Sequence, residues 1–177
     1  MSNNLRYTKV RNVKSPVRGH KTDAGIDLFI PEDLSYNEME EKFKITNDTL
    51  PVEFDENNKY IKTFVIRPNQ SILIPSGLKF DIPDGYALIA HNKSGVATKK
   101  NLLVGASVAD SGYEGEVHIN LHNVGDENVK IMAGEKIVQF LLIPVVCCDV
   151  EEVSTVEELY RNKHSDRGEG GFGSTGV

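Results

Sequence analysis

Short runs of alternating apolar and polar residues dominate the chain from residue 60 onward. β-branched and aromatic residues gather in these runs, and Pro-Asn, Pro-Ser-Gly and Pro-Asp-Gly sequences separate the first of them. Such alternation predicts half-buried strands, and the proline and glycine residues between the runs predict turns. The predicted strands cover residues 60–67, 70–75, 78–82, 86–91, 104–109, 116–123, 129–132 and 136–146. Many short strands at close spacing predict an all-β fold, a jelly-roll-like distorted barrel.

The two ends of the chain add further elements. Residues 5–13 predict a first strand, and residues 21–30 predict a short strand that follows a turn at Gly25. Near the C-terminus, residues 155–161 predict a short helix with Ser154 as its N-cap. We therefore expect a barrel that carries one or two short helices.

Residues 31–59 differ in composition from the predicted strands. They are rich in glutamate, aspartate and asparagine, which predicts a surface insertion with one helical turn near residues 37–43. Long surface insertions cost little stability. We therefore expect one β-barrel domain over residues 1–162 that includes this insertion, and a flexible C-terminal arm over residues 163–177.

Composition and charge predict a soluble, cytoplasmic protein. The 177 residues suffice for a core without a disulfide, and the net charge of −6 offers no basic surface for nucleic acid. The N-terminus has no apolar signal core, and the longest apolar run, residues 137–148, is too short to span a bilayer. The adjacent Cys147 and Cys148 cannot form an ordinary structural disulfide. We expect them to be small buried apolar residues in a reduced compartment.

A candidate functional feature lies between the strand-like runs 106–109 and 116–122. Turn residues separate these runs, which predicts a β-hairpin with a slightly long loop. The loop presents Asp110 and Tyr113, three positions apart. A carboxylate beside an aromatic ring on a rigid turn suits the binding of a flat, polar small molecule near a base. The alternative is that Asp110 only caps the turn and Tyr113 only covers the sheet.

The C-terminal arm is also a candidate. Five of its last ten residues are glycine. Glycines let backbone N–H groups converge on an anion, Arg167 offers a bidentate charge for a phosphate, and Phe172 has a ring that can lie on a planar base. Together these features predict a lid that closes over a nucleotide. The alternative is a disordered C-terminus, which most chains possess.

Five separated segments, in order along nearly the whole chain, resemble the five motifs of the trimeric dUTPases. They are residues 23–28, 93–97, 104–115, 134–139 and 167–176. The resemblance implies a homotrimer of jelly-roll subunits that hydrolyses dUTP to dUMP and pyrophosphate. This reaction keeps uracil out of DNA and supplies dUMP for thymidylate synthesis. It further implies active sites that are shared between subunits and closed by the arm of one of them.

The resemblance also implies the chemistry of the site. Asp110 matches the general base that activates water for attack on the α-phosphorus. The implied cofactor is Mg²⁺ bound by the triphosphate oxygens, with Asp27 acting only through the water shell of the metal and no direct protein ligand. The alternative for Asp27 is a turn residue that precedes a strand.

The same motifs imply the substrate-binding residues. Those that match triphosphate contacts are Lys93, Ser94, Gly95, Gln139, Arg167, Gly173, Ser174 and Thr175. Phe172 is implied to stack on uracil, Tyr113 to lie beneath the deoxyribose, and backbone groups near Ser107 and His118 to pair with the edge of the base. The alternative for Gln139 is a polar residue at a barrel edge. That alternative is weakened because Gln139 interrupts an apolar strand, where an unpaired amide is costly.

The chain departs from the family pattern at several positions. Lys93 and Lys136 stand where arginine is usual, so each keeps the charge but loses the planar fork that holds a phosphate at two points. Ser107 stands where glycine is common, and Ala109 where isoleucine is common. Both residues are small, so we expect the pocket to survive.

Two other functions stay open. The dCTP deaminases share the fold and a similar loop, but that reaction needs a glutamate shortly after the loop, where this chain has Asn120. The other is a binding or regulatory module that uses residues 31–59 as its contact surface. Retention of Asp110, Ser94 and the arm argues against a loss of catalysis.

Overall fold

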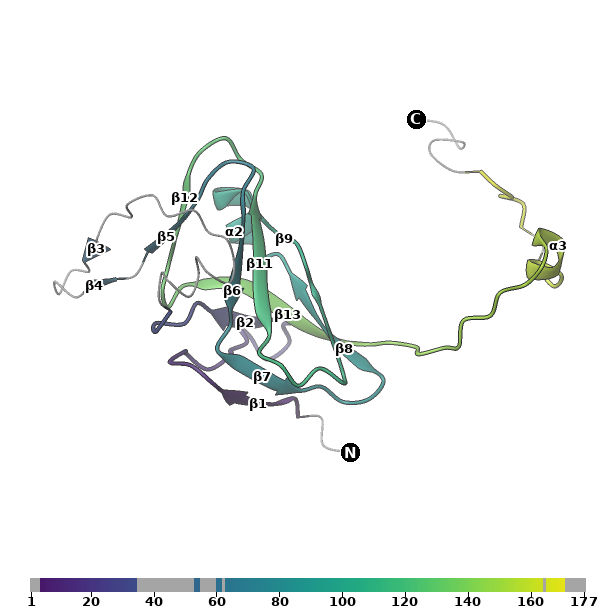
Figure 1. Ribbon diagram of the computed structural model, residues 1–177, viewed down its shortest axis with the longest axis horizontal. Coiled ribbons are helices and arrows are strands. Elements are labelled where there is room, and N and C mark those ends of the chain that lie inside the picture. Colours follow the sequence, from purple (N-terminus) through teal and green to yellow (C-terminus); the bar gives the residue numbers. More distant parts are fainter. Residues whose placement is uncertain (1–3, 35–52, 55–59, 62, 164, 171–177) are drawn as a thin grey trace. The chain divides into compact units, whose positions relative to one another are not determined.

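The computed structural model describes residues 4–34, 53–54, 60–61, 63–163 and 165–170 (Figure 1). The strands are β1 (Arg6–Lys9), β2 (Ile26–Phe29), β3 (Glu53–Phe54), β4 (Tyr60–Ile61), β5 (Thr63–Ile66), β6 (Ser71–Pro75), β7 (Leu78–Asp81), β8 (Tyr86–His91), β9 (Leu102–Val104), β10 (Val108–Asp110), β11 (His118–Asn123), β12 (Val129–Met132) and β13 (Lys136–Pro144). The helices are α2 (Ser94–Lys100) and α3 (Val156–Leu159).

The chain divides into two compact units. The first, Met1–Val146, contains the strands, and the second, Cys147–Val177, contains α3. The arm boundary expected at residue 162 falls inside the second unit. In the described part of the chain, no helix has the length and apolar character needed to cross a membrane.

The strands of the first unit pair in an antiparallel manner. The two larger sheets have the orders β10-β8-β13-β2 and β6-β11-β9. Three smaller pairs accompany them, β1 with β7, β12 with β5, and β3 with β4. This arrangement is the all-β, jelly-roll-like fold that the alternating pattern predicts.

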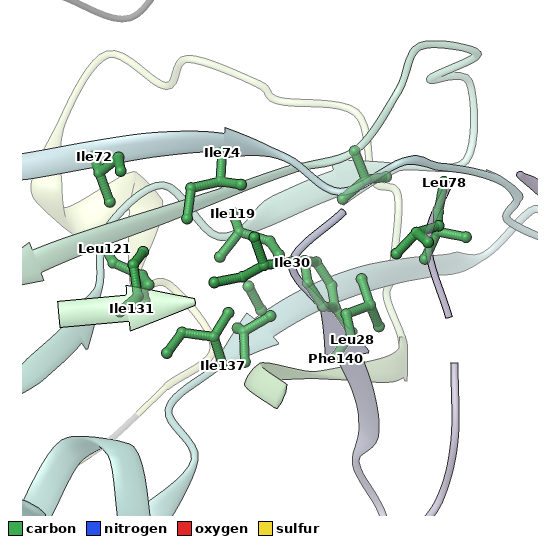
Figure 2. Close-up of a cluster of buried hydrophobic side chains, with 14 of the residues drawn as sticks. Leu28, Ile30, Ile72, Ile74, Leu78, Ile119, Leu121, Ile131, Ile137 and Phe140 are labelled. Atoms are coloured by element: carbon green, nitrogen blue, oxygen red, sulfur yellow. The ribbon is translucent and has the colours of Figure 1, made fainter. Parts of the chain in front are cut away.

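The two larger sheets share one apolar core (Figure 2). The four-stranded sheet contributes Leu28 and Phe140, and the three-stranded sheet contributes Ile74 and Ile119, each at most 2% exposed. Alternation along β7 sends every second side chain inward, since its residues are buried and exposed in turn. Burial of each such side chain stabilises the fold by about 1.5–3 kcal/mol.

The hairpin predicted around Asp110 is wrong. β10 pairs with β8, whereas β11 pairs with β6 and β9, so the strands on either side of the loop belong to different sheets. The alternating pattern predicts that each segment is a strand, but it does not choose the partner. Each strand takes its partners from the sheet that it joins, and in that sheet its apolar face packs on the common core.

The single strand predicted over residues 104–109 is in fact two strands, β9 and β10, in different sheets. Gly105 lies where the chain crosses, and a Cβ at this position would be 2.1 Å from Asn120 Oδ1. Asn120 holds the crossing, because its Oδ1 accepts a hydrogen bond from the Ala106 N–H at 2.9 Å and its Nδ2 donates to the Ile72 carbonyl at 3.1 Å.

The helices also differ from expectation. α2 was not predicted, because Val96 is its one buried residue and the segment lacks an apolar stripe. α3 lies within the predicted helix at residues 155–161. Its N-cap is Thr155 rather than Ser154, and the Thr155 side chain accepts a hydrogen bond from the Glu158 N–H.

The two cysteines and residues 53–54 also differ from expectation. Cys147 and Cys148 are exposed, so the prediction that they are buried is wrong. They follow β13, where the chain has left the sheet, so neither side chain faces the core. The helical turn expected near residues 37–43 lies outside the described residues, and β3 shows that the stretch 31–59, expected to be mainly loop, also contains a short strand.

Candidate active site

A cavity of about 580 Å³ brings together three of the segments singled out in the sequence. Asp27, Lys93 and Gln139 line it, together with Asn92 and other residues. β13 lies between β8 and β2, so Gln139 pairs with Asp27 on one side and with His91 on the other. Gln139 is therefore on an interior strand of its sheet, and its interpretation as a barrel-edge residue is wrong.

Asp27 is a buried charge at this cavity. It is 7% exposed, and it lies within β2, so its interpretation as a turn residue before the strand is wrong. Its carboxylate contacts two ammonium groups, Lys93 Nζ at 2.5 Å from Oδ1 and Lys136 Nζ at 3.4 Å from Oδ2. These two cations offset the cost of burying the carboxylate.

Lys93, Ser94 and Gly95 lie together at the start of α2. Lys93 is the N-cap residue, with a φ of −79° and a ψ of 128°, and its side chain reaches Asp27 instead of capping the helix. Ser94 and Gly95 are exposed, and a Cβ at Gly95 would meet nothing within 4 Å. A cation, a hydroxyl and an unobstructed backbone are thus presented side by side, which suits an anionic ligand.

Gln139 is held from two directions. Its Nε2 donates to the Asn92 carbonyl at 2.8 Å, and Gly25 approaches so closely that a Cβ there would be 2.1 Å from Gln139 Oε1. Asn92 Oδ1 in turn accepts a hydrogen bond from the Val104 N–H at 2.7 Å. The sequence did not single out Asn92, because its role depends on the approach of β9 and β13, which are distant from it in the chain.

Asp110 is the last residue of β10 and is exposed. The Tyr113 N–H donates to the Asp110 carbonyl at 3.0 Å, so the backbone of Asp110, rather than its carboxylate, closes this turn. The Tyr113 hydroxyl donates to the Glu116 carbonyl at 2.9 Å, and a Cβ at Gly115 would be 2.3 Å from that hydroxyl. The ring thus lies against the loop with 44% of its residue surface exposed.

Ser107 and His118, the predicted contacts to the base, flank this loop. The Ser107 carbonyl accepts a hydrogen bond from β8 at 2.7 Å. His118 Nδ1 lies 2.8 Å from the Glu116 carbonyl, and since a carbonyl only accepts, Nδ1 carries the proton. The Glu116 carboxylate accepts from the Gly77 N–H at 2.7 Å and pairs with Arg11 Nε at 2.8 Å, which anchors the end of the loop. Glu116 is a second residue that the sequence did not identify.

Within one chain, Asp110 and the cavity lie at opposite ends of β8. Asp110 is opposite Ala87, and Gln139 is opposite His91. Ala87 and His91 are four residue steps apart along the strand, which corresponds to about 13 Å at about 3.3 Å per residue. A single chain therefore does not bring the predicted base together with Gln139, Lys93 and Ser94.

The predicted arm residues fall mostly beyond the described part of the chain. Arg167 belongs to the second unit, where its Nε donates to the Gly170 carbonyl at 2.6 Å. The remaining predicted arm contacts, Phe172, Gly173, Ser174 and Thr175, lie outside the described residues. Their roles stay predictions.

Comparison with known proteins identifies the family. Residues 59–176 match the dUTPase family model. The chain belongs to the dUTPase family. It is 34% identical to the deoxyuridine 5'-triphosphate nucleotidohydrolase of Corynebacterium jeikeium over 165 residues, which are 92% of this chain and 85% of the relative. It is 31% identical to the enzyme of the same name from Clostridium tetani, over 93% of this chain and 90% of the relative. The resemblance inferred from the five segments is confirmed.

Solved dUTPase structures share the fold. A mutant dUTPase of Staphylococcus bacteriophage 80alpha, bound to dUpNHpp, matches with a TM-score of 0.72 and 25% identity over 99% of this chain and 100% of that one. The dUTPase from phage phi11 of S. aureus, described for its species-specific insert, matches with a TM-score of 0.66 and 22% identity over 88% of this chain. The jelly-roll-like fold of this chain is thus the fold of dUTPases.

Proposed function

We propose that this chain hydrolyses dUTP to dUMP and pyrophosphate, as a homotrimer with shared active sites. The observation that carries the proposal is membership of the dUTPase family over residues 59–176, with relatives that are deoxyuridine triphosphate nucleotidohydrolases. The grouping of Asp27, Lys93 and Gln139 around one cavity supports it, because these residues come from three of the five motif-like segments. A cytoplasmic location belongs to the same proposal.

Asp110 is proposed to act as the general base. Its exposed position at the end of β10 leaves the carboxylate accessible to a water molecule. A carboxylate is a weak base, so correct positioning of the water and neutralisation of the phosphate charge must supply most of the acceleration. Lys93, Ser94, Gly95 and Gln139 are proposed to contribute by holding the phosphates.

Mg²⁺ is the proposed cofactor. Two of the residues that line the cavity, Asp23 and Asp27, carry carboxylates, and Asp27 is already paired with two lysines. Among the described residues no three histidine, cysteine or acidic side chains gather to hold a metal ion. This donor set suits a Mg²⁺ ion held mainly by triphosphate oxygens and water, with Asp27 in contact with the water shell. Such an ion would neutralise charge on the triphosphate.

The separation along β8 supports a shared active site. One triphosphate must present its α-phosphorus to the base while its other phosphates contact the cavity. Asp110 and Gln139 of one chain lie about 13 Å apart along that strand, at about 3.3 Å per residue, and on opposite sides of it. We propose that Asp110 of one subunit acts on the substrate held by Lys93, Ser94 and Gln139 of its neighbour.

The loop after β10 is proposed to recognise the nucleoside. Backbone groups near Ser107 and His118 would pair with the uracil edge, and Tyr113 would lie beneath the deoxyribose. A site built to pair every polar group of uracil rejects cytosine, because a mismatched base leaves buried groups unpaired. In the arm, Arg167 and the residues that follow are proposed to close over the γ-phosphate, with Phe172 stacked on the base.

The test is pyrophosphate release from dUTP, dCTP, dTTP and UTP, with and without Mg²⁺. We expect the wild type to use dUTP with strong preference, and Asp110→Asn to lose about 10²–10⁴-fold in kcat. Asp126→Asn, a change at an exposed acid in the loop between β11 and β12, is the matched control and should keep full activity. Equal rates for Asp110→Asn and the wild type would exclude Asp110 as the base.

The competing deaminase function has no support in the site. Both polar atoms of the Asn120 side chain are bound to backbone groups, of Ala106 and Ile72. An asparagine in this structural role is no substitute for a general base. The role of residues 31–59 as a contact surface concerns a stretch of which only residues 53–54 are described, and it stays a prediction.

A further inference from the structure

Lys93, the cation proposed to bind phosphate, is already paired with Asp27. Lys93 is the one lysine or arginine among the described residues that line the 580 Å³ cavity. Its Nζ lies 2.5 Å from Asp27 Oδ1. A triphosphate that enters the cavity therefore meets a Lys93 ammonium group that is already paired with Asp27.

Moving Lys93 away from Asp27 has a large free-energy cost, because the carboxylate is buried. The Asp27 side chain is 10% exposed, so water cannot readily replace the lost partner. A buried carboxylate that loses its counter-ion is strongly destabilised, because its desolvation is no longer compensated. Release of Lys93 is favourable only if another cation stays with Asp27.

Lys136 supplies that second cation. Its Nζ lies 3.4 Å from Asp27 Oδ2, whereas Lys93 contacts the other carboxylate oxygen, Oδ1. Lys136 begins β13, next to β2, its side chain is 46% exposed, and it is not among the residues that line the cavity. One carboxylate is thus placed between two ammonium groups, of which only one lines the cavity.

We propose that Lys136 is a positioning residue that keeps Asp27 neutralised while Lys93 moves to the triphosphate. This inference rests on the proposed function and deepens it. The bound state then contains two ion pairs, Lys136 with Asp27 and Lys93 with phosphate, where the free state has both lysines on Asp27.

Lysine suits this exchange better than arginine at the mobile position. Its ammonium group is a compact charge on a flexible stem, and it needs no fixed planar geometry to leave one oxygen and reach another. The two lysines that depart from the usual arginines are the two that contact Asp27. The departures therefore occur together, at one carboxylate.

The test is a double-mutant cycle measured by calorimetric binding of dUpNHpp in the absence of metal. Lys136→Met should weaken binding about tenfold, because binding then strips Asp27 of its last cation. In an Asp27→Asn background the same Lys136→Met change should have no effect, since no carboxylate remains to be neutralised. Lys136→Arg should restore wild-type affinity.

The controls separate this role from simple attraction of an anion. Lys99→Met removes an equal charge from an exposed position in the last turn of α2 and should leave affinity within about twofold of the wild type. An equal loss from Lys136→Met in both backgrounds would show long-range attraction and overturn the proposal. So would wild-type affinity in the Lys136→Met single variant.

Failure of the proposed reaction would look different. A wild type that binds dUpNHpp with the expected coupling, yet releases no pyrophosphate from dUTP, would overturn the reaction and leave the role of Lys136 standing. A wild type that hydrolyses dUTP but shows no coupling between Lys136 and Asp27 would overturn only the role of Lys136.

Discussion

Gly25 shows how a single residue makes room for the site. The sequence suggested a turn residue, but what the structure requires of Gly25 is the absence of a side chain, because a Cβ would lie 2.1 Å from Gln139 Oε1 and 2.9 Å from its Cδ. Gln139 is fixed on its other side by the Asn92 carbonyl at 2.8 Å. The small residue therefore sets the position of a predicted phosphate contact.

We expect Gly25→Ala to lower kcat/KM for dUTP by about 100-fold, because a displacement of about 1 Å in a positioned group has effects of this size. The cause would be displacement of Gln139, so steady-state kinetics should be repeated in a Gln139→Ala background. In that background the clashing Oε1 and Cδ atoms are gone and only the contact with Cβ, at 3.1 Å, remains, so Gly25→Ala should cost much less than in the wild type. A full further loss in that background would contradict the packing explanation.

The charge at Lys93 gives a second prediction at the residue scale. Lys93→Ala removes a cation that contacts both Asp27 and, by our proposal, a phosphate, whereas Lys93→Arg keeps the charge. We expect Lys93→Ala to lose about 100-fold in kcat/KM, and Lys93→Arg to lose far less. Equal activity of the wild type and both variants in pyrophosphate release would exclude a role for this side chain.

At the scale of the element, two glycines in neighbouring turns allow the effect of backbone strain on stability to be distinguished from the effect of packing. Gly77, between β6 and β7, has a φ of +75°, and a Cβ there would be 2.8 Å from Val13 Cγ1. Gly85, between β7 and β8, has a φ of +79°, and a Cβ there would meet nothing within 4 Å. Both residues have the left-handed conformation, but only Gly77 is crowded.

We expect Gly85→Ala to lower the free energy of unfolding by about 1 kcal/mol, the cost of the left-handed backbone alone. Gly77→Ala should lower it by about 3 kcal/mol, because overpacking adds to the same strain. Denaturant unfolding at one fixed protein concentration measures both, since subunit association affects apparent stability. Equal losses of unfolding free energy in the two variants would show that Val13 moves aside at no cost.

At the scale of the whole molecule, the distance along β8 makes the active site a property of the assembly. We expect mixed trimers of Asp110→Asn and Gln139→Ala subunits to exceed the residual activity that either variant has alone. In a closed ring, random mixing gives about a quarter of the sites an intact Asp110 from one subunit and an intact Gln139 from the next. Pyrophosphate release after co-refolding measures the recovery, and each variant refolded with itself is the control. Absence of recovery would place a complete site within one chain.

Much of the β architecture followed from local sequence. β8 and β12 have the predicted bounds, 86–91 and 129–132, because turn sequences enclose each run of strand-forming residues. The motif-like segments also led to Asp27, Lys93 and Gln139, which the structure brings to one cavity. These features depend on residues close together in the chain.

The pairing of strands that are distant in the chain could not be predicted from local sequence. The turn residues around Asp110 predict a hairpin, yet β10 and β11 join different sheets. The apolar run that ends at Cys147 and Cys148 predicts burial, yet both cysteines are exposed. Asn92 and Lys136 acquire their roles only when β9, β13 and β2 come together. Strand identity is decided by the alternation of neighbouring residues, whereas strand partners and buried charge pairs are decided by which distant segments the folded core brings into contact.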